Sequence, residues 1–561
     1  MGCSCMEGVC RGWSTREPFA NLNVSVLFNR SGTGFNCTTL RYLIDIIYYV
    51  VYYMESLLLG IDVGTSSVKA VVIDQRGSVH AIGQAEYPLH HIRPAWVEQD
   101  PEDWWNGTCK AIKEALSLIP HGADRVLALA VSCQAPALLA LDRSGQPLRP
   151  AMIWMDRRAE AETIELTKLL GADQIYKITG NRPDAFYVAA RLLWLKNHEP
   201  EILKKTWKFV QVNGYINYRL TGKLTLDTSN AALLQLRDYQ KEEWSEPLCD
   251  ICGVKPSQFP DVVAAHFVQG KVTEPASKAT GLKVGTLVMA GTVDSASAAL
   301  EAGVVEPGIA AEMTGTSTVV ILPNDKGLTE PAFIAMPHAL PGIHLLLGAM
   351  VASGGCLRWF RDQFGQQEVQ IASKNNSDAF DLLTQLASGI DPGSDGVIFL
   401  PYMMGERSPL WHTNARGVFF GLSLATSRAA VVRSILEGTA FSLLHNIEIA
   451  QHAGVEVREV RSVGGCSRSD LWNQIKADVL GIPLLLPRKS VGSPFGSAIL
   501  AGIGAGVFTD IRKSLPEMVK LERRFEPNMA YHERYMKSYK VFRDIYEHLK
   551  GDFDHLASIT P

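Results

Sequence analysis

The stretch that decides the fold reads Leu57-Leu-Leu-Gly60-Ile-Asp62-Val-Gly64-Thr65-Ser66-Ser67-Val-Lys69-Ala-Val-Val-Ile-Asp74. An apolar run and a β-branched run flank a small polar turn, a pattern that predicts a strand, a tight turn and a second strand. The hydroxyls and backbone N–H groups of this turn suit a phosphate. Asp62, at the end of the first strand, is a carboxylate that can hold Mg²⁺. Most such turns are only turns, so the rest of the chain must decide between the two interpretations.

Composition sets the broad class. The chain has 561 residues, which favours two or three domains, and its hydrophobic content of 47% is typical of a globular protein. It carries 54 basic and 58 acidic residues, so no excess of positive charge indicates a nucleic-acid partner. Cys249 and Cys252 form a single CxxC, without a second pair at zinc-ribbon spacing. The cysteines therefore indicate reduced structural thiols and a cytoplasmic protein, rather than a metal site.

Residues 1–53 differ in texture from everything that follows. They are rich in Cys and Asn and end in a Tyr-rich apolar run. Between Asp45 and Glu55 this run has nine residues, whereas a membrane span needs about 20. We expect an extension outside the fold, with Met54 as a natural start and no membrane partner. An amphipathic helix on a membrane surface is the alternative.

From residue 57 onward the pattern is α/β. Helices are expected at 101–118, 188–197, 213–221, 355–364, 428–452, 469–480 and 528–550, with a tail that frays after Gly551. The pattern of strand, small polar turn and strand occurs a second time, with Thr314-Gly315-Thr316-Ser317 as the turn, much as in the opening stretch. Two such hairpins predict a duplicated architecture with one half at 57–305 and the other at 306–550.

Three glycine-rich loops, at 60–67, 314–317 and 464–467, each follow a predicted strand. The chain has no GxxxxGK[ST] motif, which excludes a P-loop. It also has no HExxH and no GxSxG motif. Three such loops fit a nucleotide whose phosphates are held from two sides. Phosphoryl transfer also needs a group that accepts the proton of the attacking hydroxyl. Asp294, after a buried apolar strand, is the candidate, and its alternative role is a helix N-cap.

These motifs, taken in order and with their spacing, resemble the FGGY family of carbohydrate kinases over residues 57–545. The two hairpin turns look like the family's phosphate loops, and the segment from Gly464 through Pro483 looks like its adenosine segment. Residues 417–422 with 434–438 match the second family signature, with Ala430 as one departure. Residues 186–197 resemble the first signature, where Arg191 stands in place of a Lys.

The resemblance implies two actin-like ATPase (ribonuclease-H-like) domains with an interdomain cleft, with ATP and Mg²⁺ as cofactors and a sugar as substrate. Asp294 would be the catalytic base and Asp62 the carboxylate on the Mg²⁺ side. The implied nucleotide contacts are Gly64, Thr65, Ser66 and Lys69 in the first loop, Gly315, Thr316 and Ser317 in the second, and Gly464, Gly465 and Ser469 near adenosine. A structural lysine is the alternative for Lys69. The family also implies a homodimer.

The sugar side is expected in the first half. Gln134 and Ala135 fall where similar xylulokinases have Gln-Met-His, and Trp154 and Asp156 belong to a Trp-x-Asp-x-Arg segment. Ser295, after the base, completes the implied contacts. Core packing is the alternative for Trp154, and a helix N-cap is the alternative for Asp156.

The predicted reaction is phosphorylation of D-xylulose to D-xylulose 5-phosphate, with gluconate or another pentulose or polyol as alternatives. A different class of function, an actin-like ATP-driven switch, has the same core. No separate substrate-binding domain follows in this sequence, which speaks against the switch.

Overall fold

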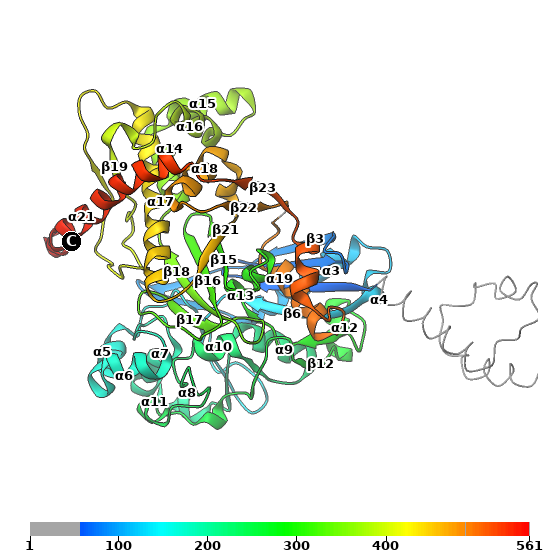
Figure 1. Ribbon diagram of the computed structural model, residues 1–561. Helices are drawn as coiled ribbons and strands as arrows, with labels where there is room; N and C mark the ends of the chain where they lie inside the picture. Colours follow the sequence, from blue (N-terminus) through cyan, green and yellow to red (C-terminus); the bar gives the residue numbers. More distant parts are fainter. Residues whose placement is uncertain (1–55, 489, 560–561) are drawn as a thin grey trace, which may run out of the picture. The chain divides into compact units, whose positions relative to one another are not determined.

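The computed structural model describes residues 56–488 and 490–559. The predicted extension at 1–53 lies outside these residues. The described residues from Leu57 onward form one compact unit, and its two large sheets are visible in Figure 1.

The first sheet has seven strands, and the opening stretch lies at its centre. Their order is β12-β13-β6-β1-β2-β3, with β14 beside β6. The strands are β1 (Leu57–Val63), β2 (Ser67–Ile73), β3 (Val79–Glu86), β6 (Val126–Cys133), β12 (Val268–Lys271), β13 (Leu287–Met289) and β14 (Thr292–Val293). β1 and β2 pair antiparallel as the predicted hairpin, while β6 lies parallel to β1.

The second sheet also has seven strands, in the order β17-β18-β16-β15-β21-β22-β23. They are β15 (Gly308–Thr314), β16 (Thr318–Asn324), β17 (Ile334–Pro337), β18 (His344–Met350), β21 (Val457–Val463), β22 (Leu484–Pro487) and β23 (Leu521–Phe525). β15 and β16 form the second predicted hairpin, and β21 lies parallel to β15.

The two sheets repeat one pairing pattern. In each, an antiparallel hairpin (β1–β2, β15–β16) has a further antiparallel strand on one side, β3 or β18. On the other side, each has two parallel strands and then an antiparallel edge, β6-β13-β12 or β21-β22-β23. The predicted α/β fold class is confirmed, and the repeated topology accounts for the similar hairpins. The division at residues 305 and 306 stays a prediction.

Alternation along β1 explains why its sequence is almost entirely apolar. Leu57, Leu59 and Ile61 face a core that includes Trp104 and Ile112 of α3 (Pro101–Ser117). Leu58, between them, faces the opposite core with α19 (Ser493–Gly504). A strand covered on both faces needs apolar residues at successive positions, because neighbouring side chains point to opposite sides.

Helix α19 lies within the predicted second half, yet it packs against β1 and β6 of the first sheet and against α13 (Asp294–Glu301). Gly60 makes this approach possible, because a Cβ there would lie 1.8 Å from the carbonyl oxygen of Pro494. Packing therefore does not follow the predicted domain division at this helix.

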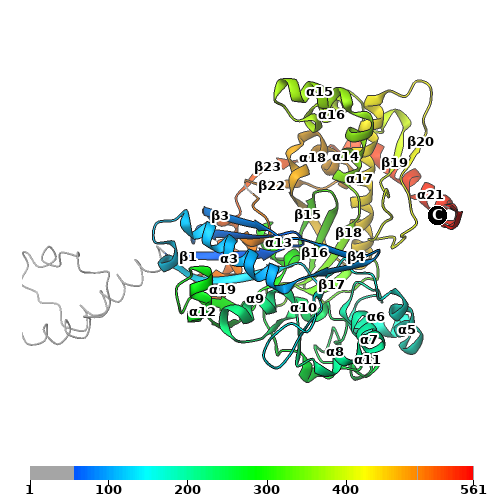
Figure 2. The same ribbon diagram turned by 180° about the vertical axis from the view of Figure 1, so that it is seen from behind.

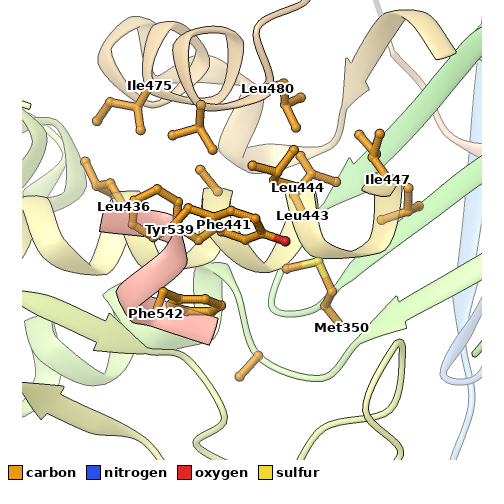
Figure 3. Close-up of a cluster of buried hydrophobic side chains, with 14 of the residues drawn as sticks. Met350, Leu436, Phe441, Leu443, Leu444, Ile447, Ile475, Leu480, Tyr539 and Phe542 are labelled. Carbon is orange, nitrogen blue, oxygen red and sulfur yellow. The ribbon is translucent and has the colours of Figure 1, made fainter. Parts of the chain in front are cut away.

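The other large core lies between the second sheet and three helices. These are α17 (Arg428–His452), α18 (Asp470–Leu480) and α21 (Met529–Ile559). Figure 3 shows Leu436, Phe441, Leu444, Ile475, Tyr539 and Phe542 packed together in this core. The predicted bounds of α17, 428–452, are confirmed. The Ser427 hydroxyl caps its start by accepting from the N–H of Ala430.

The C-terminal helix corrects one expectation. We predicted fraying after Gly551, but α21 continues to Ile559. Phe553 is buried, and Asp554 accepts hydrogen bonds from His412 and Asn414 at 3.0 and 2.9 Å. These tertiary contacts hold the last turns, although Gly551 itself favours the unfolded chain.

Smaller helices complete the unit. In the first half they include α5 (Glu160–Leu170), α6 (Ala172–Thr179), α7 (Val188–His198), α9 (Val212–Thr221) and α11 (Glu246–Cys252), and in the second α14 (Gly354–Phe364), α15 (Gln366–Asn375) and α16 (Ala379–Ser388). Figure 2 shows α5, α6, α7 and α11 gathered together, away from α15 and α16. Across residues 56–488 and 490–559, no helix is both long and apolar enough to cross a bilayer.

Candidate active site

Three predicted site residues meet at one edge of the first sheet. Asp62 lies near the carboxyl end of β1, Gln134 directly follows β6, and Asp294 directly follows β14. The parallel register pairs Val63 with Cys133, and Cys133 with Val293, so these three strands end side by side. In open α/β sheets this carboxyl edge is the usual place for a ligand.

Asp294 has the environment of a general base. It is half-buried as the first residue of α13, and its carboxylate accepts a hydrogen bond from the N–H of Ser295 at 2.6 Å. Burial raises the pKa of Asp294 to about 7, and the charge of Asp62 adds to the shift. Asp294 is not the N-cap of α13, because that position is held by Val293.

Asp62 presents a second carboxylate beside the first. Its Oδ1 accepts a hydrogen bond from the Ser132 hydroxyl at 2.7 Å. Burial raises the pKa of Asp62, while Ser132 and the charge of Lys69 act in the opposite direction. Two half-buried carboxylates, one of which raises the pKa of the other, fit a divalent cation, and oxygen is the donor that Mg²⁺ prefers. Among the described residues, no group of three or more His, Cys, Asp or Glu side chains could hold a metal by itself.

The turn between β1 and β2 is held by its own backbone and by Tyr87. The N–H of Gly64 donates to the carbonyl of Ser67 at 3.0 Å, and the Tyr87 hydroxyl donates to the carbonyl of Gly64. Thr65 and Ser67 are half-buried and Ser66 is exposed, so the loop is open to a ligand. Lys69 reaches away from the loop tip, and its Nζ donates to the carbonyl of Val491 at 3.3 Å. This contact agrees with the structural alternative for Lys69.

A polar chain connects this turn to the predicted sugar side. Gln99 is fully buried, and its Nε2 donates to the carbonyl of Thr65 at 2.6 Å. Its Oε1 accepts from Trp104 at 2.9 Å and from Gln134 at 2.6 Å. Trp154 donates to the Thr65 hydroxyl at 3.0 Å, so its indole bridges to the phosphate-loop candidate instead of belonging only to the core. Sequence reasoning missed Gln99, because a polar residue before a helix looks like an ordinary helix flank.

Two other predicted sugar contacts differ in accessibility. Ala135 is half-buried, beside a cis peptide bond to Pro136. Asp156 has no exposed surface, and its carboxylate accepts from Arg158 and from the N–H of Val97 at 2.7 Å. Helix α5 starts only at Glu160, so Asp156 is not its N-cap. The geometry gives Asp156 a structural role and speaks against direct contact with a sugar.

A buried polar network lies directly behind Asp294, and the sequence did not reveal it. Asp227 accepts from Asn213 and Asn230 at 2.9 and 2.8 Å, and from the Ser229 hydroxyl. The same Ser229 oxygen accepts from the N–H of Val293 at 3.2 Å. This network fixes the end of β14, and hence the backbone that carries Asp294. Asp227, Ser229 and Asn230 come from one short run, where Asp227 caps α10 (Thr228–Ala232), but no local signal joins this run to Asn213 or Val293.

The second sheet presents two exposed loops at the equivalent edge. The N–H of Gly315 donates to the carbonyl of Ser317 at 2.8 Å, and residues 315–317 are exposed. The next loop begins at Gly464, where a Cβ would lie 2.6 Å from the carbonyl oxygen of Thr314. Gly465 is exposed, and Ser469 caps α18 by accepting from the N–H of Trp472 at 3.3 Å. The two loops are therefore neighbours, as one nucleotide would require.

Two cation–π contacts join the predicted halves, and each half supplies the arginine of one contact and the tryptophan of the other. Arg407 of the second half lies over the Trp154 ring at 5.4 Å, and Arg182 of the first half lies over Trp411 at 4.7 Å. The buried Glu406 anchors the loop between them by accepting from the N–H groups of Val351 and Arg407 at 2.8 and 2.9 Å. A residue of the second half thus reaches the predicted sugar side.

The CxxC pair does not resemble a redox site. Both thiols are buried, and burial raises the pKa of Cys249 to about 11. The Cys252 thiol donates to the carbonyl of Ala189 at 3.3 Å. Reactive cysteines have a lowered pKa and an accessible sulfur, so these two are structural.

Comparison with known proteins identifies the family. Residues 57–301 match the N-terminal domain of the FGGY family of carbohydrate kinases, and residues 310–505 match its C-terminal domain. The xylulose kinase of Bacillus subtilis is 31% identical, over 88% of this chain and 97% of its own length. The glycerol kinase of Thermococcus kodakarensis is also 31% identical, over 87% of this chain and 96% of its own.

The solved structures agree. The crystal structure of xylulose kinase from Rhodospirillum rubrum has a TM-score of 0.82 and 28% identity, and it covers 89% of this chain and 100% of its own. Both family models, the long relatives and this structure point the same way. The chain belongs to the FGGY family of carbohydrate kinases, enzymes that phosphorylate sugars with ATP.

Proposed function

We propose that this chain transfers the γ-phosphoryl group of ATP to D-xylulose, giving D-xylulose 5-phosphate. The observation that supports this substrate most directly is the likeness to xylulose kinases along almost the whole chain. Membership in a family of kinases replaces the alternative of a nucleotide-driven switch. Gluconate and glycerol are the competing substrates, because related folds in this family act on different polyols and small pocket changes separate them.

Asp294 is the proposed base. A pKa of about 7 leaves roughly half of the carboxylate ionised at neutral pH, which is the range where a general base works best. It accepts the proton of the sugar hydroxyl as that oxygen attacks the γ-phosphorus. The Asp227–Ser229 network holds the backbone of Val293, so the carboxylate does not need to search for its position. Ser295, half-buried next to it, is the proposed neighbour of the sugar.

The exposed loops are the proposed nucleotide contacts. The Gly64 and Gly315 N–H groups bond within their own turns. The remaining N–H groups and the hydroxyls of residues 65–66 and 316–317 are the proposed contacts to the phosphates, from the first and the second sheet respectively. Gly464, Gly465 and Ser469 lie next to the second phosphate loop, where the adenosine would sit. Gln134, Ala135 and Trp154 line the sugar side, and the Trp154–Thr65 hydrogen bond ties that side to the phosphates.

Asp62 is the proposed carboxylate for Mg²⁺. Ser132 orients its Oδ1. The pKa values of both Asp62 and Asp294 are raised, so added positive charge at this edge would stabilise both ionised carboxylates. When bound, Mg²⁺ neutralises phosphate charge. Mg²⁺ usually takes one or two protein carboxylates and the substrate's phosphates, and this edge of the sheet offers that set.

A panel of acceptors tests the substrate. ADP release is measured with D-xylulose, D-ribulose, gluconate and glycerol, each over a range of concentrations. The expected result is the highest kcat/KM for D-xylulose, by at least about tenfold, which is what one lost polar contact costs. A higher kcat/KM for gluconate or glycerol would overturn the substrate assignment while leaving the kinase family intact.

The family resemblance also supports a homodimer as a proposal. Light scattering on the full chain measures its mass directly. A mass of about 61.5 kDa would be that of the monomer and would overturn it.

A further inference from the structure

One buried carboxylate joins the two proposed nucleotide loops of the second half. Glu312 lies in β15, two residues before the loop at 314–317, and none of its side chain is exposed. Its Oε1 accepts from Lys476 Nζ at 2.5 Å and from the Ser462 hydroxyl. Its Oε2 accepts from the Thr314 hydroxyl, which also bonds to that of Thr318 at 2.8 Å.

Each partner of Glu312 belongs to an element that carries a different part of the proposed nucleotide site. Thr314 and Thr318 bracket the phosphate-binding loop. Ser462 is in β21, two residues before Gly464, where the adenosine loop begins. Lys476 is in α18, the helix that Ser469 caps. One carboxylate therefore holds the base of both loops and the helix that follows them.

The two loops also contact each other directly. Gly464 lies against the Thr314 carbonyl so closely that a side chain would not fit. The Cys466 thiol is 3.6 Å from the carbonyl oxygen of Gly315. Displacement of one loop would therefore be transmitted to the other, both through these direct contacts and through the hydrogen bonds to Glu312.

Stability does not explain a charged pair at this position. Side-chain exposure is 4% for Lys476 and 0% for Glu312, so both charges have lost their water. Burying an ion pair often gains nothing over well-packed apolar residues. The other known use of a buried pair is to fix one arrangement among several, and here the arrangement is that of two ligand-binding loops.

We propose that Glu312 and Lys476 are positioning residues that lock the second phosphate loop and the adenosine loop at the spacing required by one nucleotide. This inference rests on the proposed nucleotide contacts at 315–317 and 464–469. It assigns no direct ligand contact to either residue. It predicts that loss of the pair weakens ligands that span both loops and spares ligands that reach only one.

The test compares ADP with AMP by calorimetry on the full chain, with Mg²⁺ and without sugar. In Lys476→Met, the Kd for ADP is expected to rise about tenfold, a usual size for coupling between neighbouring groups. AMP lacks the β-phosphate that is proposed to reach the loop at 315–317, so its Kd is expected to change less than about twofold. Lys476→Arg retains the cation, so its Kd for ADP should stay close to that of the wild type.

Arg433→Met is the matched control. Arg433 and Glu437 form a comparably buried pair at 2.8 Å in α17, and neither residue belongs to either loop or to α18. This variant also leaves a buried carboxylate unpaired, so its loss of thermal stability should match that of Lys476→Met while ADP binding stays intact. If Lys476→Met does not fold, the double variant Glu312→Gln, Lys476→Met removes both charges and takes its place.

The outcomes separate clearly. Equal weakening of AMP and ADP, or no weakening of either, would overturn the positioning role. A wild-type chain that binds neither nucleotide would overturn the proposed nucleotide site, and this inference with it. Because no sugar is present, the result does not depend on which sugar is the substrate.

Discussion

The charge of Asp62 raises the pKa of Asp294, although only the fold brings β1, which carries Asp62, and β14, which Asp294 follows, to one edge. Burial is the larger cause of the shift, and Asp62 adds to it. One carboxylate is thus tuned toward neutral pH by a second that is proposed to face the metal. Activity, pH dependence and stability should all reflect this pair.

Replacement of the base is the most direct prediction. Asp294→Asn should lower kcat by about 10²- to 10⁴-fold, the usual contribution of a general base. ADP binding, measured by calorimetry, should change little, because no proposed nucleotide contact is removed. Asp142→Asn, in an exposed turn, is the control and should retain full activity. Unchanged turnover in Asp294→Asn would contradict the assignment.

The pH profile provides a second measurement. Since Asp294 must be ionised to accept a proton, kcat/KM should fall below pH 7, to about one tenth of its plateau near pH 6. In Asp62→Asn, which removes the neighbouring charge, the midpoint of the residual activity should move to lower pH. A midpoint that stays in place would show that Asp62 does not act on the base.

The same shift predicts a stability effect of defined sign. The raised pKa means that folded protein holds more protons than unfolded protein between about pH 4 and 7, so the contribution of Asp294 to stability falls as pH rises through this window. Asn does not titrate. In the absence of nucleotide, Asp294→Asn should therefore be more stable than wild type at pH 8, by up to about 4 kcal/mol, and nearly equal at pH 4. Denaturant titrations at both pH values measure this, and a less stable variant at pH 8 would contradict it.

Trp154 offers a test of the link between sugar and phosphate sides. Trp154→Phe retains an aromatic ring but loses the donor to the Thr65 hydroxyl. Loss of one such hydrogen bond costs about 1 kcal/mol, so kcat/KM for the sugar should fall about fivefold. Melting temperature should change little, because the residue is half-buried. A large loss of stability with normal kinetics would instead indicate a core residue.

Gly60 tests the packing of α19. Gly60→Ala would place a methyl group against the backbone of Pro494 and Ala498, so we expect a loss of about 3 kcal/mol, the upper end for overpacking. Gly551→Ala, in the exposed part of α21 with no neighbour within 4 Å, should instead gain about 0.5–1 kcal/mol. Chemical denaturation compares the two variants. Equal effects at both positions would argue against the tight contact.

Local signals predicted much of the fold. The hairpin at Gly64 and the capped helix after Ser427 depend on residues close in sequence, and both were predicted correctly. The predicted end of α21 was wrong because His412, which is distant in the sequence, holds Asp554, and local sequence patterns do not reveal such a contact. Gln99 is the clearest omission at the site, since its partners come from three separate segments.

The extent of prediction at the site follows the same division. Asp62 and Asp294 could be proposed because each lies at or just after the end of an apolar strand in a recognisable motif. Their mutual effect on pKa could not, because it requires the pairing of β1, β6 and β14. Asp156 lay in a motif too, but sequence alone could not show that Arg158 occupies its carboxylate.

The position of α19 affects how the protein is made. The groove at Gly60 on the first sheet is filled by residues 493–504, which are synthesised long after the strands they cover. The nascent first half must therefore leave the ribosome with an apolar face of β1 and β6 uncovered. Its core can close only when most of the chain has been translated, which makes the interval before residue 504 emerges the period of greatest exposure to aggregation.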